Sequence, residues 1–101
     1  MHAVKRIEII APSFEIDKIL GGLDKVGVAG YTVIRNVTGK GHFGAVSEEM
    51  DLGSKKLSNV YVLCCCPQEQ VKPILEVIRP LLNKFGGVCY LSDAIEIRSL
   101  K

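Results

Sequence analysis

The segment Asn59–Cys66 constrains the fold of this chain more than any other, because it is an almost unbroken run of apolar Val, Tyr, Leu and Cys residues. Successive side chains of a strand point to opposite faces, so such a run is typical of a strand that is covered on both faces. Pro67 follows at once and ends the strand, since proline cannot continue a hydrogen-bonded ladder. The chain must therefore bury both faces of one strand.

Hydrophobic periodicity predicts further strands and two helices around this segment. Strands are expected at 5–11, 31–37 and 88–98, the last with Ile95 and Ile97 facing inward. Helices at 14–26 and 68–85 follow from apolar residues that recur at the helical spacing.

Capping and breaking residues refine the two helices. Ser13 is the expected N-cap of the first helix and Gly27 its expected end. Gly21 and Gly22 weaken this helix, and they are expected either to admit a closely packed neighbour or to mark a frayed turn. Pro80 lies inside the second helix and is expected to kink or restart it.

The order strand–helix–strand, long loop, strand–helix–strand predicts an α+β fold. It is that of the ferredoxin-like split βαβ sandwich (βαββαβ), with a four-stranded antiparallel sheet and both helices on one face. The chain, 1–101, is expected to form a single domain around one core. Because the helices cover only one face of the sheet, the other is expected to be buried against other copies of the chain.

The long loop at about 38–57 has neither helical nor strand periodicity and contains four glycines. An unstructured loop of this length in a small domain is usually functional. We expect it to be flexible and to offer apolar side chains to a partner, namely Phe43, Val46, Met50 and Leu52.

The sequence Gly39-Lys40-Gly41-His42 at the start of this loop is a candidate anion site. Glycine lets backbone N–H groups approach a phosphate, and lysine adds a positive charge. The motif is not a P-loop, because it lacks the GxxxxGK[ST] pattern and no helical pattern follows it. An ordinary flexible turn is the alternative interpretation. A second glycine loop at 83–87 is expected at the same end of the sheet, and in an oligomer the two loops could enclose an anionic ligand.

Composition argues against several classes of function. The net charge of +2 is too small to indicate a nucleic-acid partner or an anionic membrane surface. No apolar run approaches the roughly 18 residues of a membrane span, and the first residues do not resemble a signal peptide. A cytoplasmic protein that binds no nucleic acid is expected.

Catalytic and metal-binding patterns are weak, and no enzyme activity, catalytic residue or metal ligand is expected. The serines have no Ser-His-Asp arrangement around them. Cys64, Cys65 and Cys66 alternate between the faces of one strand, which favours small apolar filling over a shared metal. The titratable side chains of the long loop are interpreted as solvated: His42, Glu48, Glu49 and Asp51. The alternative for His42 is contact with a phosphate, and the alternatives for the three carboxylates are acid–base chemistry or metal binding.

The chain resembles the PII signal-transduction superfamily over essentially its whole length. The most specific likeness is Gly27-Val28-Ala29-Gly30-Tyr31-Thr32-Val33 followed by Gly39-Lys40-Gly41-His42, and it continues in 4–10, 16–20, 60–67 and 95–98. Members of this family are ferredoxin-like trimers that bind adenine nucleotides in clefts between subunits. Their long T-loop changes shape with the ligand and docks on transporters, enzymes or regulators. The resemblance implies a homotrimer with a T-loop at about 38–57.

The resemblance also implies the nucleotide-binding residues. Those near the adenine would be Gly30, Tyr31 and Thr32. Those that open the T-loop beside the phosphates would be Gly39, Lys40 and Gly41. Those of the B-loop, contributed by the neighbouring subunit, would be Lys84, Gly86 and Gly87. Arg98 would reach in from the last strand.

Where the chain departs from the pattern of the classical family members, it resembles the PII-like branch. This branch includes the regulators of cyanobacterial bicarbonate transport and the carboxysome-associated proteins. Residues 38–56 contain no tyrosine, the B-loop at 83–87 is short, and Glu96 replaces one basic residue of the last strand. Uridylylation and 2-oxoglutarate sensing through Mg-ATP are therefore not expected. The implied ligands are AMP, ADP, ATP or cyclic AMP, with bicarbonate in the carboxysome type, and no cofactor is required.

The implied partner is a membrane transporter or a carbon-metabolism protein that is contacted through the T-loop, which would place the chain at the membrane periphery. Two other hypotheses stay open. A trimeric metal-binding or metal-tolerance protein of the same fold would use Cys64–Cys66 or His42. A slow ATPase would use the loop carboxylates.

Overall fold

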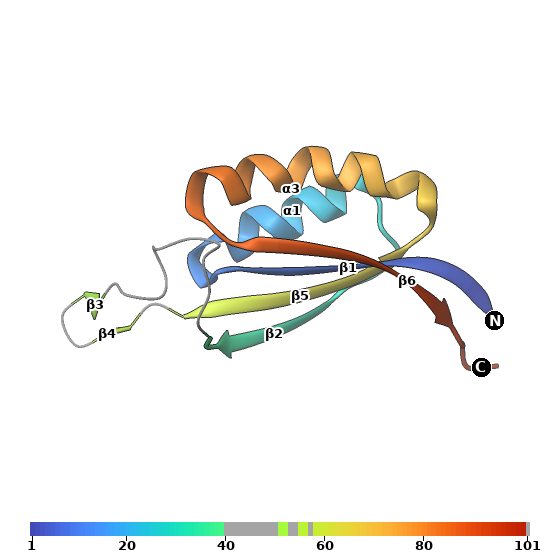
Figure 1. The fold of residues 1–101 in the computed structure, drawn as a ribbon, viewed down its shortest axis with the longest axis horizontal. Coiled ribbons are helices and arrows are strands. Elements are labelled where there is room, and N and C mark those ends of the chain that lie inside the picture. The colour runs from blue at the N-terminus through green and yellow to red at the C-terminus, as the bar shows by residue number, and fades with distance from the viewer. Residues whose placement is uncertain (40–50, 53–54, 57, 101) are drawn as a thin grey trace.

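The fold is a four-stranded antiparallel sheet with two helices on one face (Figure 1). The computed structural model describes residues 1–39, 51–52, 55–56 and 58–100. The strand order is β2-β5-β1-β6, with β1 His2–Pro12, β2 Thr32–Val37, β5 Asn59–Cys66 and β6 Val88–Glu96. The helices are α1 Ile16–Val26 and α3 Val71–Phe85, preceded by the short 3-10 helices η1 Ser13–Glu15 and η2 Gln68–Gln70. This confirms the predicted ferredoxin-like arrangement.

The core lies between the sheet and the helices, and the two central strands form its floor. Ile7 pairs with Cys64 and Ile9 pairs with Val62, so the helix-facing side chains of β1 and β5 are in register. The helices contribute the apolar stripe predicted from their spacing. The largest fully buried side chains are Ile7, Ile9, Pro12, Ile19, Leu23, Val60, Val62, Cys64, Cys66, Ile74 and Ile78.

The start of α1 differs from the expected capping. Ser13 makes no side-chain cap; its N–H donates to the Ser58 carbonyl over 2.9 Å and its hydroxyl lies 2.8 Å from that of Ser58. Ser13 therefore ties the end of β1 to the residue before β5. Glu15 precedes the helix and is buried, with a carboxylate oxygen 3.9 Å from Lys18 Nζ. The predicted end is confirmed: Gly27 has φ 87° in the left-handed region.

Helix α3 runs without a break through Pro80, so the expected restart is wrong. Proline removes the hydrogen bond to the carbonyl of residue 76, and Glu76 is exposed, so water can satisfy that carbonyl. The helix ends at Phe85, as its periodicity predicted, so residues 83–85 of the predicted glycine loop at 83–87 are helical.

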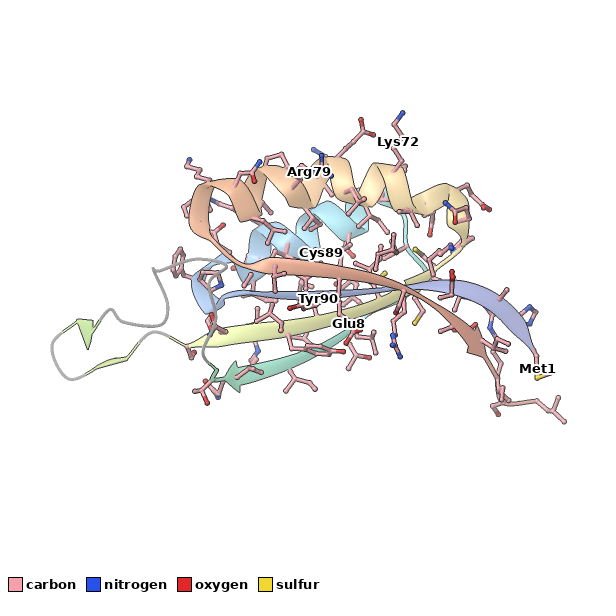
Figure 2. The ribbon with its side chains drawn as sticks, viewed as in Figure 1. Met1, Glu8, Lys72, Arg79, Cys89 and Tyr90 are labelled. Atoms are coloured by element: carbon pink, nitrogen blue, oxygen red, sulfur yellow. The ribbon has the colours of Figure 1, made fainter. Side chains whose placement is uncertain are left out.

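The face of the sheet that points away from the helices is largely apolar. Alternation along β5 directs Val62 and Cys64 to the helices and Leu63 and Cys65 to the other face, as predicted. Figure 2 shows Cys89 on the helix side of the sheet and Glu8 and Tyr90 on the other. We call this side the open face; its apolar residues are Val4, Ile10, Ile34, Tyr61, Leu63, Cys65, Val88, Tyr90 and Ala94.

The expected burial of Ile95 and Ile97 is wrong, although the pairing of Ile95 with Ala3 places Ile95 on the helix side of the sheet. In the chain these side chains are 66% and 78% exposed. The reason is that β6 is an edge strand whose last residues run beyond the helix layer, toward the end of the molecule that carries both termini (Figure 1).

Most of the predicted T-loop, including Lys40, Gly41 and His42, lies outside the described residues. Within it are two short strands, β3 Asp51–Leu52 and β4 Lys55–Lys56, which pair antiparallel. Its flexibility stays a prediction.

The two adjacent glycines of α1 provide a test of the helix packing. A Cβ at Gly21 would meet nothing within 4 Å, whereas at Gly22 it would lie 3.1 Å from Val77 Cγ2 on α3. We expect Gly21→Ala to raise the free energy of unfolding by about 1 kcal/mol through helix propensity alone. Gly22→Ala should gain less, or lose stability, because Val77 must move. Urea unfolding of both variants measures this, and equal gains would contradict the close packing of α1 on α3.

Candidate functional site

The predicted site residues lie at two opposite ends of the sheet. Arg98 follows β6 at the end of the molecule where Glu96 pairs with His2. Gly86 and Gly87 lie at the other end, where Val88 pairs with Ile10. Gly39 is also at that second end, because it follows Val37, which pairs with Asn59 at the start of β5. One chain therefore does not bring the two groups together.

A pocket of about 480 Å³ occupies the end that carries the termini. It lies on the open face, and all four residues predicted for this part of the site line it: Gly30, Tyr31, Thr32 and Arg98. Sequence reasoning missed the remaining lining residues, which are Val4, Ala29, Leu63, Cys65, Cys66, Pro67 and Glu96. These residues lie close together because of the strand register, which cannot be predicted from any local motif.

The charged lining of this pocket is an ion pair. Arg98 Nε donates to the Glu96 carboxylate, with 64% of the Arg98 side chain and 33% of the Glu96 side chain exposed. Glu96 and Arg98 are two positions apart along the end of β6, so both can be presented on one face. Arg98, which the family resemblance places in the nucleotide site, is therefore already paired.

Tyr31 contributes an aromatic ring and a hydroxyl to the same pocket. Partial burial, followed by the charge and hydrogen bond of Asp24, raises the pKa of Tyr31 above its usual value. The hydroxyl therefore remains protonated at neutral pH. A ring with 37% exposure also offers a surface on which a flat base can stack.

The glycines at the second end have a structural role of their own. A Cβ at Gly87, where φ is 122°, would lie 2.6 Å from the Ile10 carbonyl oxygen, so only glycine fits there. The N–H of Gly86 donates to the Leu82 carbonyl over 2.9 Å, which closes α3. That amide is already used within the chain, so it is not available to bind an anion.

Two lysines gather at this end around Phe85. Lys84 Nζ lies 5.1 Å from the ring centroid, and Lys18 Nζ, from α1, lies 4.9 Å from it. Phe14 packs edge-on against the same ring at 5.9 Å. The sequence predicted Lys84 but not Lys18, because the approach of α1 to the end of α3 is a tertiary contact. This end therefore carries two lysines, one of them beside Glu15, and the opposite end carries Arg98.

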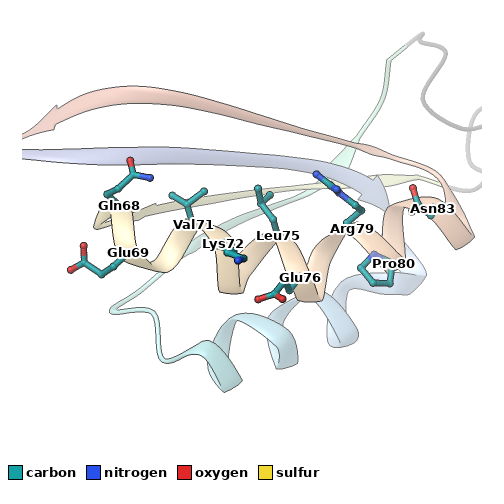
Figure 3. Close-up of a pocket in the computed structure, with 9 residues that line it drawn as sticks. All are labelled: Gln68, Glu69, Val71, Lys72, Leu75, Glu76, Arg79, Pro80 and Asn83. Atoms are coloured by element: carbon teal, nitrogen blue, oxygen red, sulfur yellow. The ribbon is translucent and has the colours of Figure 1, made fainter.

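A larger cavity of about 800 Å³ runs along α3 (Figure 3). Its lining comes entirely from η2 and α3, and it contains none of the predicted site residues. Its charged lining residues alternate in sign, as on a solvated helix surface: Glu69 of η2, then Lys72, Glu76 and Arg79 of α3. The smaller pocket is therefore the better candidate, since loops and strands that are distant in sequence converge on it.

The open face carries a polar network among its apolar residues. The Tyr61 hydroxyl donates to Glu8 over 2.7 Å, and this hydrogen bond, followed by burial, raises the pKa of Tyr61. Arg6 Nε lies 3.4 Å from the other Glu8 oxygen and 3.1 Å from the Ser92 hydroxyl. The network pairs the charges on this face within one chain, so they do not oppose its burial as unpaired charges would.

Three of the four cysteines pack in or against the core, namely Cys64, Cys66 and Cys89. All four are free thiols, and Cys64 and Cys66 are buried toward the helices while Cys65 faces the other way. Burial, followed by the influence of Cys66, raises the pKa of Cys64 from 9.0 to about 11, so its thiol is protonated at neutral pH and is a poor metal ligand. In the part of the chain that the structure describes, no three His, Cys, Asp or Glu residues are grouped as a metal site. His42, the other metal candidate, lies outside that part.

The fold is ferredoxin-like, and the residues predicted for one site lie at two opposite ends of its sheet. Residues 4–101 match the family model of the nitrogen regulatory protein P-II, and the chain belongs to this family. No curated protein matches. In the described residues, no helix has the length and apolar character needed to span a membrane.

Solved structures agree with this assignment. The nitrogen regulatory PII-like protein CPII from Thiomonas intermedia, bound to ADP, AMP and bicarbonate, is 26% identical, with 98% of each chain covered and a TM-score of 0.77. CPII bound to ADP, AMP and acetate is 27% identical over 96% of this chain and 91% of that one, with a TM-score of 0.79. A structure from Thermus thermophilus, 17% identical over 91% and 87% of the two chains with a TM-score of 0.71, supports the fold alone.

The raised pKa of Cys64 predicts a loss of stability in alkali. Between about pH 9 and pH 11 the unfolded chain releases the Cys64 proton while the folded chain keeps it, so the free energy of unfolding falls as pH rises. For a shift of this size the loss is about 2–3 kcal/mol. Cys64→Val keeps the packing and removes the titrating thiol. In urea unfolding over the same pH range, the free energy of unfolding of this variant should therefore fall by about 2–3 kcal/mol less than that of the wild-type protein. Parallel curves for the two proteins would show that Cys64 is not held protonated by the fold.

Proposed function

We propose that this chain is a nucleotide-sensing regulator that binds adenine nucleotides between copies of itself. The observation that carries the proposal is the division of the site: Tyr31 and Arg98 lie at one end of the sheet, and Gly39 and Lys84 lie at the other. A ring of three copies, each with its open face turned inward, would bring one end of a chain against the opposite end of its neighbour.

The roles follow from the chemistry of each group. The ring of Tyr31, beside Gly30 and Thr32, would hold the adenine by stacking and by the close approach of the backbone. Arg98 would contact the phosphates from the same chain, and Lys84 with Lys40 would contact them from the neighbour. Bicarbonate is a candidate second ligand, since CPII has been solved with it.

Regulation would act through the loop at 38–57. An anion that binds Lys40 would favour one loop conformation over the others, and a partner that contacts the loop would respond to that difference. The partner would be a membrane transporter, such as one for bicarbonate, or a carbon-metabolism protein. The mechanism needs no catalysis, and the regulator would act in the cytoplasm, at the membrane periphery when its partner is a transporter.

Isothermal titration with AMP, ADP, ATP and cyclic AMP tests the nucleotide site. We expect at least one of them to bind, and Arg98→Ala to weaken its binding about 10- to 100-fold, because a charge-assisted hydrogen bond to phosphate is worth roughly 1.5–3 kcal/mol. Lys40→Ala should weaken it as well. The matched control is Arg79→Ala, which removes the same charge from the larger cavity on α3 and should leave binding unchanged.

Two results would contradict the proposal. One is the absence of heat with all four nucleotides at protein concentrations well above tens of micromolar. The other is a loss of binding in Arg79→Ala and not in Arg98→Ala, which would move the site to α3.

A further inference from the structure

The charge balance of the pocket near the termini points to a selection among nucleotides. Glu96 and Arg98 are the charged residues that line it, and they are paired with each other. The Glu96 side chain is the more buried of the two, with 33% exposure against 64% for Arg98. Glu96 is also within β6, in register with His2, so the strand holds it in place while the arginine lies beyond the strand end.

An arriving phosphate must share Arg98 with Glu96. The guanidinium has several donors, so it can contact a phosphate and keep its bond to Glu96. The phosphate then lies near a fixed negative charge in a partly shielded site, where like charges repel more strongly than in water. This repulsion grows with the number of phosphate charges, whereas stacking of the adenine does not change.

A second carboxylate lies near the adenine side of the pocket. Asp24 interacts with the Tyr31 hydroxyl, and Tyr31 lines the pocket. Tyr31 therefore brings a second carboxylate close to the pocket, beside the Glu96–Arg98 pair, and an added negative charge does not favour a polyanion.

We propose that Glu96 is a specificity-determining residue, which limits the phosphate charge of the bound nucleotide and favours a monophosphate over a triphosphate. This inference rests on the proposed nucleotide site. Cations supplied by a neighbouring copy would strengthen the binding of all nucleotides, but the effect of removing Glu96 would keep its sign, because a negative charge at a fixed place is lost.

The test is the ratio of the ATP and AMP dissociation constants in Glu96→Gln. Titrations of AMP, ADP and ATP are carried out at low salt and without divalent cations, so that each added phosphate adds its full charge. We expect the ATP-to-AMP ratio to fall about tenfold, with ADP in between, as expected from loss of a partly shielded like charge. Glu96→Ala, which removes the same charge without the amide, should shift the ratio in the same direction.

The matched control is Asp93→Asn. Asp93 is on the same strand, is paired with Lys5 and does not line the pocket, so the variant makes the same change in net charge elsewhere. Its ratio should stay within about twofold of the wild-type value, because Asp93 points to the other face of the sheet and its side chain is 81% exposed, so water screens its charge.

The outcomes separate this inference from the proposed function. If the wild-type protein binds adenine nucleotides but Glu96→Gln and Glu96→Ala leave the ratio unchanged, the role of Glu96 is overturned and the nucleotide site stands. An equal shift in Asp93→Asn would attribute the effect to net charge and would also overturn it. If the wild-type protein binds none of the three nucleotides, the proposed function itself fails.

Discussion

Strand β5 has apolar side chains on both faces, but the helices cover only one of them (Figure 1). The arrangement of the rest of the molecule depends on this difference between the two faces. The helix side closes into a core in which Ile7, Ile9, Val62 and Cys64 are fully buried. The open face leaves Ile34 and Tyr90 each 52% exposed, beside the half-buried Leu63 and Tyr61. A sheet face of this composition is stable in water only when it is covered, and further copies of the chain are the covering that the family fold favours.

The same geometry explains why the candidate site is divided. Strands β1, β5 and β6 span the sheet, so the loops at their two ends are separated by its full length (Figure 1). Tyr31, Glu96 and Arg98 are at one end, and Lys18, Lys84 and Gly87 are at the other. Assembly that covers the open face would therefore also complete the site, and ligand binding would report on contacts between copies. A regulator gains from this coupling, because a small molecule at a subunit boundary can change the loop that lies beside it.

The sequence predicted what depends on periodicity and on local motifs. The alternation of β5, the order of the elements and the end of α1 at Gly27 were all foreseen. The family resemblance, and not periodicity, grouped Gly30, Tyr31, Thr32 and Arg98, which line one pocket. The failures were tertiary: Ser13 bonds to Ser58 instead of capping α1, and Ile95 lies beyond the helix layer. The pairing of Glu96 with Arg98 and the approach of Lys18 to Phe85 also depend on tertiary contacts. Pro80 was expected to kink or restart the helix because proline removes one helical hydrogen bond. Glu76, whose carbonyl loses that bond, is exposed, so water can replace it and the helix continues.

The most direct test of a site shared between copies is a mixing experiment with Lys84→Ala and Arg98→Ala, each of which damages one end of the chain. Each variant alone should bind the preferred nucleotide weakly. After the two are unfolded together and refolded in equal amounts, about a quarter of the boundaries between copies should combine an intact Lys84 end with an intact Arg98 end and recover wild-type affinity. Titration calorimetry of the mixture should therefore show a tight class of sites at about a quarter of the wild-type stoichiometry. A mixture that binds no better than the separate variants would contradict the shared site, as would a protein that sediments as a single chain.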